Sequence, residues 1–203
     1  MALNAFSPPG ESLLLFHICH NVTNRFVALI GEIENMAASS RFRRILSKVE
    51  GYLELEMPEK ALEELAKIDE QYRSRFSVQY LHGMAYRDRQ QYDQALPYFL
   101  RALAEKPERV EVFLALAWCY KRIDRLDEAI SAMEQAYRVA PQEPIVLYNM
   151  ACYWSLAGDK TNALSWLGRA LRMDQDLRKL IDDEPDFDTL RHDPDFEMIV
   201  RSK

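Results

Sequence analysis

The stretch Asp-Gln-Ala-Leu-Pro-Tyr-Phe at residues 93–99 has counterparts at a constant spacing on both sides. The matching stretches are EKALEEL at 59–65, DEAISAM at 127–133 and TNALSWL at 161–167. Their shared alanines recur every 34 residues, at Ala61, Ala95, Ala129 and Ala163. A fixed period of roughly 20 to 50 residues indicates an array of stacked supersecondary units. This period leaves room for two antiparallel helices and their turns in each unit.

Other positions keep the same period as the alanines. A large aromatic residue comes nine positions before each alanine, at Tyr52, Tyr86, Tyr120 and Trp154. A mostly small residue comes three positions earlier still, at Val49, Gly83, Ala117 and Ala151. With Pro107 and Pro141 closing two units, this order resembles the tetratricopeptide repeat. The resemblance implies an all-α fold, a right-handed superhelical α-solenoid of antiparallel helix pairs with flanking helices.

The repeat phase divides the chain into three regions. Residues 1–40 are expected to hold an N-terminal loop and an amphipathic helix, 41–175 the four repeats, and 176–203 a C-terminal capping segment. The repeats are placed at about 42–75, 76–109, 110–143 and 144–177. Helix pairs are expected at 41–54 and 58–72, 76–89 and 92–105, 110–122 and 126–139, and 144–156 and 160–173. Asp124 and Asp159 are expected to cap second helices.

The N-terminal region does not match the repeat. Its apolar residues alternate steps of three and four, which predicts one apolar face on a helix of about 25 residues. They are Leu15, Ile18, Val22, Phe26, Leu29, Ile33 and Met36. Such a helix could pack on the first repeat, pair with a second copy, or enter the repeat groove. Translation starting at Met36 is a further alternative.

The C-terminal region contains a small repeat of its own. The sequence Glu-Pro-Asp-Phe at 184–187 returns as Asp-Pro-Asp-Phe at 193–196. An acidic N-cap followed by proline predicts a short helix at 194–201. The apolar residues of the whole C-terminal region are expected to cover the last repeat. They are Phe187, Leu190, Phe196 and Ile199. The phrase resembles the ending of many bacterial tetratricopeptide proteins, and it lacks the glycine and spacing of a calcium loop.

Composition narrows the class of partner. The chain carries a net charge of −6, but residues 39–175 hold 20 basic and 20 acidic side chains. A neutral repeat body does not favour nucleic acid, which requires a basic face. Three cysteines without a CxxC pair suggest reduced thiols in a cytoplasmic protein. No stretch reaches the roughly 18 apolar residues of a membrane span.

The resemblance implies that the first helix of each pair lines a concave groove. Transferred to this sequence, the expected partner-binding residues are Tyr80, Met84, Arg87, Leu114, Trp118, Lys121, Tyr148, Asn149 and Cys152. An apolar, methionine-containing groove with a basic edge suits an amphipathic helix or an extended apolar peptide. Two alternatives stay open. Some of these side chains could be inter-helix core, or the chain's own N-terminal helix could cover them.

The sequence therefore predicts a protein–protein interaction adaptor or scaffold, either a monomer or a homodimer through the N-terminal helix. An alternative is an export chaperone resembling the small acidic tetratricopeptide chaperones of bacterial secretion systems. An enzyme or metal protein is the remote alternative. His17, Cys19 and His20 form the only metal-like cluster in the sequence, without a second half-site for zinc. No catalytic residue, metal or cofactor is expected.

Overall fold

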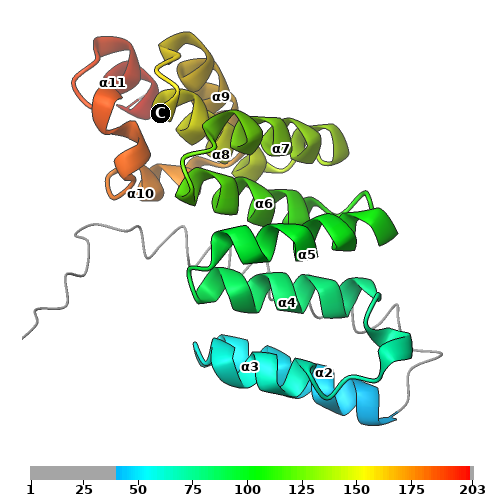
Figure 1. Cartoon of the computed structure of the whole chain (residues 1–203). Coiled ribbons are helices and arrows are strands. Elements are labelled where there is room, and N and C mark those ends of the chain that lie inside the picture. The colour runs from blue at the N-terminus through cyan, green and yellow to red at the C-terminus, as the bar shows by residue number, and fades with distance from the viewer. Residues whose placement is uncertain (1–39, 202–203) are drawn as a thin grey trace, which may run out of the picture. The chain divides into compact units, whose positions relative to one another are not determined.

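The computed structural model describes residues 40–201 (Figure 1). These residues form two compact units, 40–141 and 142–201, and each is described by itself. Throughout 40–201 the regular elements are α-helices and short 3-10 helices, without a strand. The all-α fold class is confirmed. The N-terminal helix, the alternative start at Met36 and the cluster around Cys19 lie outside the described residues.

The N-terminal unit is a series of antiparallel helices (Figure 1). Within it, α4 packs on α5, α6 on α7, and α5 on α6. Every expected helix is present in this unit, and all but α3 begin and end within one residue of the expected positions. The elements are α2 (Ser40–Glu54), α3 (Pro58–Leu65), η1 (Glu70–Tyr72), α4 (Phe76–Asp88), α5 (Tyr92–Glu105), α6 (Val110–Arg122) and α7 (Leu126–Val139).

Helix α3 is the exception, because the expected range of 58–72 is too long. The helix ends at Leu65, and Ile68 follows in a turn with its side chain buried. The chain then forms η1, where the ring of Tyr72 stacks on Phe42 with centroids 4.5 Å apart. A continuous α-helix would carry Tyr72 away from α2. The tertiary contact therefore outweighs local helix propensity here.

The repeat period is a packing requirement. Ala61, Ala95 and Ala129 are each fully buried. At Gly83 the reason for a small residue is explicit, because a Cβ atom there would lie 2.5 Å from Cε1 of Phe99. Atoms in a close-packed interior cannot approach to that distance without displacement. Helices α4 and α5 therefore owe their close approach to a glycine.

The turn inside each repeat has the same backbone geometry. Glu56, Gln90 and Asp124 have φ angles of 54°, 58° and 59°, and Gly158 has 76°. In every case the next amide donates to the carbonyl of the repeat's large aromatic residue, as from Met57 to Tyr52. This left-handed residue closes the first helix in a Schellman-like cap. The expectation that Asp124 caps α7 is wrong, since it forms this turn and Arg125 takes the N-cap position.

The C-terminal unit contains the last helix pair and the tail. Helix α8 packs on α9, η3 lies against α8, and α11 lies against α9. Asp159 caps α9 as expected, accepting a hydrogen bond from the amide of Asn162 at 2.9 Å. The elements are α8 (Pro144–Leu156), α9 (Lys160–Met173), η2 (Gln175–Leu177), α10 (Arg178–Ile181), η3 (Pro185–Leu190) and α11 (Pro194–Arg201).

The two Pro-Asp-Phe phrases of the tail form equivalent turns. A carboxylate oxygen of Glu184 accepts the amide of Asp186 at 3.2 Å, and Asp193 accepts the amide of Asp195 at 2.9 Å. Lys160 of α9 forms ion pairs with Asp193 and Asp195, at 2.6 and 2.8 Å. These bonds hold the start of α11 against the start of α9. Of the apolar residues expected to form a cap, Phe187, Leu190 and Phe196 are buried and Ile199 is half-buried within the C-terminal unit.

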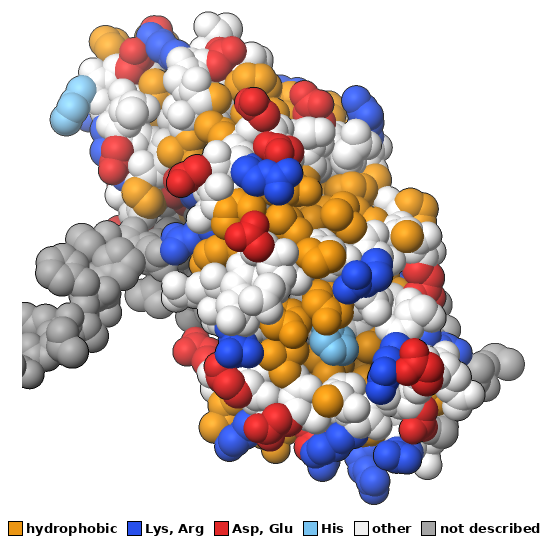
Figure 2. Space-filling model, viewed as in Figure 1, with side chains coloured by type: hydrophobic (Ala, Val, Ile, Leu, Met, Phe, Trp, Pro, Cys, Tyr) orange, Lys and Arg blue, Asp and Glu red, His pale blue; other side chains and the backbone are white. Residues whose placement is uncertain are grey.

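Charges of both signs are interspersed over the face shown in Figure 2, with hydrophobic side chains between them. This mixture agrees with the balanced charge of residues 39–175. Between residues 40 and 201, no helix combines the length and apolar character needed to cross a membrane.

Candidate functional site

Helix α4 contributes three of the predicted groove residues, and all three are buried. The exposed fraction of Tyr80 is 1%, that of Met84 is 3% and that of Arg87 is 8%. The Tyr80 ring stacks on Phe76 at 5.7 Å and lies 6.0 Å from Phe99. Arg87 donates to the carboxylate of the adjacent Asp88 at 2.9 Å. These side chains form a packed layer within the N-terminal unit.

Helix α6 carries the accessible part of the predicted site. Leu114 is buried, but Trp118 and Lys121 are each half-buried. The Lys121 ammonium lies 5.4 Å from the centroid of the Trp118 ring, and the Arg122 guanidinium lies 6.0 Å from it. Arg122 also lies 5.6 Å from the ring of Tyr92, at the start of α5. We call Trp118, Lys121, Arg122 and Tyr92 the Trp118 surface.

The geometry of the Trp118 surface follows from helix periodicity. Lys121 and Arg122 come three and four positions after Trp118, so both project over the same face of α6. Cations above an aromatic ring are attracted by its quadrupole. They also lie in the last turn of α6, where the helix dipole favours positive charge. The surface therefore presents a large apolar ring with a positive edge.

Helix α8 carries the remaining predicted residues, which lie inside the C-terminal unit. Tyr148 and Cys152 have exposed fractions of 0% and 1%, and Asn149 is also buried. The Tyr148 ring meets Phe187 of η3 edge-on, with centroids 5.7 Å apart. Burial, reinforced by the nearby charges of Cys152 and Glu184, raises the pKa of the Tyr148 hydroxyl far above its ordinary value. The chain's own tail therefore covers this part of α8.

The nine predicted groove residues differ in exposure, which the sequence pattern does not reveal. Trp118 and Lys121 keep exposed area, whereas the other seven predicted residues are buried. Tyr92 was not predicted, because it lies at the start of a second helix and belongs to no motif. Its contribution depends on the approach of α5 to α6, which the repeat pattern alone does not reveal.

His82 and Cys119 are the histidine and the cysteine of the N-terminal unit. His82 stacks on Tyr98 at 4.8 Å, and its Nδ1 atom lies 2.9 Å from the carbonyl oxygen of Val78. Burial lowers the pKa of His82. Burial also raises the pKa of the Cys119 thiol to about 12, so at neutral pH it stays protonated and weakly nucleophilic. Cys119 is fully buried, and His82 is half-buried against Tyr98.

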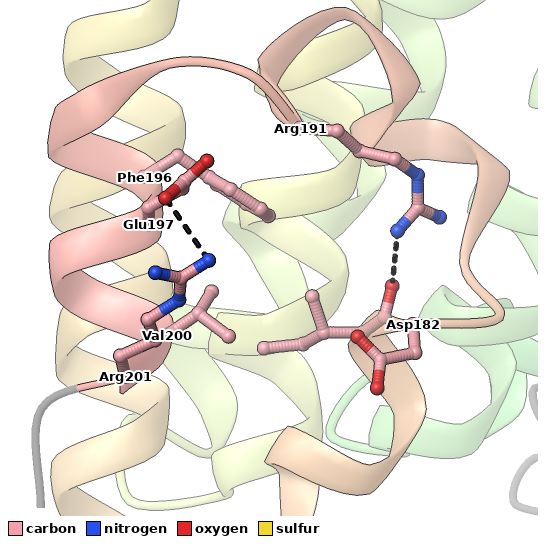
Figure 3. Close-up of a pocket in the computed structure, with 7 residues that line it drawn as sticks. Asp182, Arg191, Phe196, Glu197, Val200 and Arg201 are labelled. Atoms are coloured by element: carbon pink, nitrogen blue, oxygen red, sulfur yellow. Dashed lines mark hydrogen bonds and ion pairs between the residues drawn. The ribbon is translucent and has the colours of Figure 1, made fainter.

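A small pocket of about 210 Å³ lies in the tail, between α10 and α11 (Figure 3). Its charged rim is internally paired. Arg201 forms an ion pair with Glu197 at 3.1 Å, and Arg191 donates to the carbonyl oxygen of Ile181 at 3.2 Å. Phe196 and Val200 point from α11 toward the segment that carries Asp182 (Figure 3). The pocket is a small gap left between packed elements of the tail.

Comparison with known proteins agrees with the helix pairs, the repeated turns and the buried alanines. The family model described as tetratricopeptide repeat matches residues 80–144. The described helix pairs have the fold of a tetratricopeptide-repeat array. The match covers the second and third repeats, which contain the Trp118 surface.

Solved structures share this tetratricopeptide fold. The crystal structure of MamA has a TM-score of 0.62 and 16% identity, over 86% of this chain and 99% of MamA. YrrB, described as a TPR protein with an unusual peptide-binding site, has a TM-score of 0.60 and 20% identity, over 84% of this chain and 87% of its own. At these identities the likeness concerns the fold alone.

One curated relative matches about half of this chain. The general transcriptional corepressor trfA of Dictyostelium discoideum is 31% identical over 108 residues. These residues are 51% of this chain and 8% of the corepressor. The chain thus spans less than a tenth of that relative's length.

Proposed function

We propose that this protein is an adaptor or scaffold that binds a partner segment at the Trp118 surface. A tetratricopeptide array has a protein-interaction role in general. The observation that carries the proposal is the half-buried Trp118 ring with Lys121 and Arg122 at its edge. Tryptophan and arginine dominate binding energy at protein interfaces when a partner excludes water from them.

The chemistry of the surface defines the partner. An apolar or aromatic side chain of the partner would pack on Trp118, and neighbouring carboxylates would face Lys121 and Arg122. An acidic amphipathic helix supplies both on one face. Tyr80, Met84, Arg87 and Leu114 would support the surface from below, because α4 and α6 are in contact.

Three predicted groove residues are left out of the proposed contact surface. Tyr148, Asn149 and Cys152 are buried in the C-terminal unit, and Phe187 packs on Tyr148. A partner could reach them only after η3 had moved away from α8. The Trp118 surface requires no such rearrangement.

The proposal is tested by affinity purification from the native cell with Trp118→Ala beside wild type. Trp166→Ala is the matched control, because Trp166 is also half-buried and carries the Arg169 guanidinium at 4.3 Å from its ring, but belongs to a second helix. We expect specific partners to be lost with Trp118→Ala and kept with Trp166→Ala. Equal recovery with both variants would overturn the proposal.

A further inference from the structure

Three acidic or thiol side chains that are distant in sequence meet inside the C-terminal unit. Cys152 belongs to α8, Glu184 precedes η3 and Asp186 lies in its first turn. Their possible ligand atoms, one sulfur and two carboxylate oxygens, all lie within 4.8 Å of one another. All three side chains are buried, with exposed fractions of 1%, 1% and 5%.

The packing of the tail brings these groups together. Phe187 follows Asp186 directly, and its ring packs against Tyr148. Tyr148 comes one helical turn before Cys152, so the two share a face of α8. Glu184 accepts the Asp186 amide, which fixes the first turn of η3 beside that face. Covering α8 with η3 therefore places two carboxylates at the thiol.

A fourth polar atom belongs to the same site. The hydroxyl oxygen of Tyr148 is buried and has no hydrogen-bond partner in the described part of the chain. Tyr148 lies one helical turn before Cys152 on the same face of α8, the helix against which η3 packs. A buried hydroxyl without a hydrogen bond has lost its hydration without a replacement partner, which is unfavourable. Tyr148 thus offers an unused oxygen to whatever binds between the three groups.

Arg191 holds the same segment in place. Its guanidinium donates to Asp188 and to the carbonyl oxygens of Ile181 and Glu184, and these hydrogen bonds fix the backbone of the tail around the three groups.

We propose that Cys152, Glu184 and Asp186 bind a zinc-like divalent cation, with the Tyr148 hydroxyl as the fourth ligand. Zinc takes thiolate sulfur at about 2.3 Å and carboxylate oxygen at about 2.0–2.2 Å. Ligand atoms around one ion can therefore lie up to about 4.5 Å apart, close to the observed 4.8 Å limit. The thiolate disfavours calcium and magnesium, which take oxygen ligands.

The ion would fasten η3 to α8. Because it binds the folded tail and has few preformed ligands in the unfolded chain, it would stabilise the C-terminal unit by mass action. The sequence did not suggest this site, since its ligands come from separate segments without a metal-binding spacing. The site is also independent of partner binding at Trp118.

The test uses the full chain, stripped of metal with a chelator and titrated with Co²⁺ and then Zn²⁺. We expect one ion per chain, a thiolate-to-cobalt charge-transfer band, and displacement of Co²⁺ by Zn²⁺ with a rise in Tm. Cys152→Ser should abolish the band, whereas Cys119→Ser and Cys19→Ser should keep it. Tyr148→Phe, which keeps the ring on Phe187, should weaken binding about ten- to hundredfold.

Glu184→Gln provides an isosteric test, because glutamine can still accept the Asp186 amide that caps η3. Circular dichroism establishes that each variant is folded. We expect folded Glu184→Gln to bind Co²⁺ at least tenfold more weakly than wild type. A folded wild-type chain that gives no thiolate band overturns the proposal, as does a band that survives Cys152→Ser or is lost only with Cys19→Ser.

Discussion

The ring of Tyr148 meets the ring of Phe187 edge-on, with the two planes at 87° and the centroids 5.7 Å apart. Tyr148 lies on the helix face that a tetratricopeptide repeat normally turns toward a partner, and Phe187 comes from the tail. The fourth helix pair therefore uses this face of α8 for intramolecular packing. The proposed function accordingly assigns partner binding to the N-terminal unit, where Trp118 keeps exposed area.

Phe187→Ala should destabilise the C-terminal unit by about 3–5 kcal/mol, because a fully buried aromatic side chain leaves a cavity beside Tyr148. Urea denaturation followed by circular dichroism measures the free energy of unfolding. Met198→Ala is the control, since Met198 is largely exposed on α11 and its truncation should change stability by less than about 0.5 kcal/mol. Similar losses in both variants would contradict the role of Phe187.

Gly83→Ala should destabilise the N-terminal unit by about 1–3 kcal/mol, because the new Cβ atom would collide with the buried Phe99 ring. Gly51→Ala is the matched change in α2, where no atom lies within 4 Å of the added carbon. Alanine is the better helix former, so this variant should gain about 0.5–1 kcal/mol. Thermal or urea unfolding of the pair separates steric contact from helix propensity.

Glu56→Gly and Gln90→Gly should each raise the free energy of unfolding by up to about 1 kcal/mol, because both residues hold positive φ angles that favour glycine. Gly158→Ala should have the opposite effect at the equivalent turn. Asp124→Gly should gain less, since aspartate tolerates this conformation better. Chemical denaturation of the four variants provides the measurement, and a loss of stability in both Glu56→Gly and Gln90→Gly would refute the argument.

Glu50 should make stability depend on pH. Burial, followed by the charge of Glu54, raises the pKa of Glu50 from 4.5 to about 7 in the folded chain. Between these values the folded state binds more protons than the unfolded state, so stability falls as the pH rises through this window. A pKa shift of this size changes the free energy of unfolding by at most about 3 kcal/mol. Because solvent reaches the half-buried Glu50 side chain, we expect the change to be smaller than this bound.

Unfolding of wild type and Glu50→Gln at pH 4 and pH 8 tests this dependence. The variant should be more stable than wild type at pH 8, with the advantage shrinking toward pH 4. Glu63→Gln, which changes an exposed carboxylate of α3, serves as the control. An advantage of Glu50→Gln that does not change with pH would contradict the account.

The sequence predicted the helices well because the residues that define the repeat period are also the residues that pack in the core. The same residue, such as Ala95, sets the period and fills the core. Prediction failed where one particular contact or backbone conformation overrode the local sequence signal. Helix α3 ends early so that Tyr72 can stack on Phe42, and Asp124 serves a left-handed turn although its side chain suits a cap.

The candidate site was harder to predict than the fold. Helix positions identify which side chains share a face, and they correctly grouped Trp118 with Lys121 on α6. They do not show what covers that face. The burial of Tyr148 depends on Phe187, which no repeat position specifies, and the cluster of Cys152 with Glu184 and Asp186 depends on the same contact.

The central claim is that Trp118 anchors a partner segment, and the dissociation constant of a purified partner tests it most directly. The partner recovered with wild type would be titrated against wild type, Trp118→Ala and Trp166→Ala. The account predicts at least a thirtyfold weaker Kd for Trp118→Ala, about 2 kcal/mol of a binding hot spot, and a Kd within about twofold of wild type for Trp166→Ala. An unchanged Kd for Trp118→Ala would contradict it.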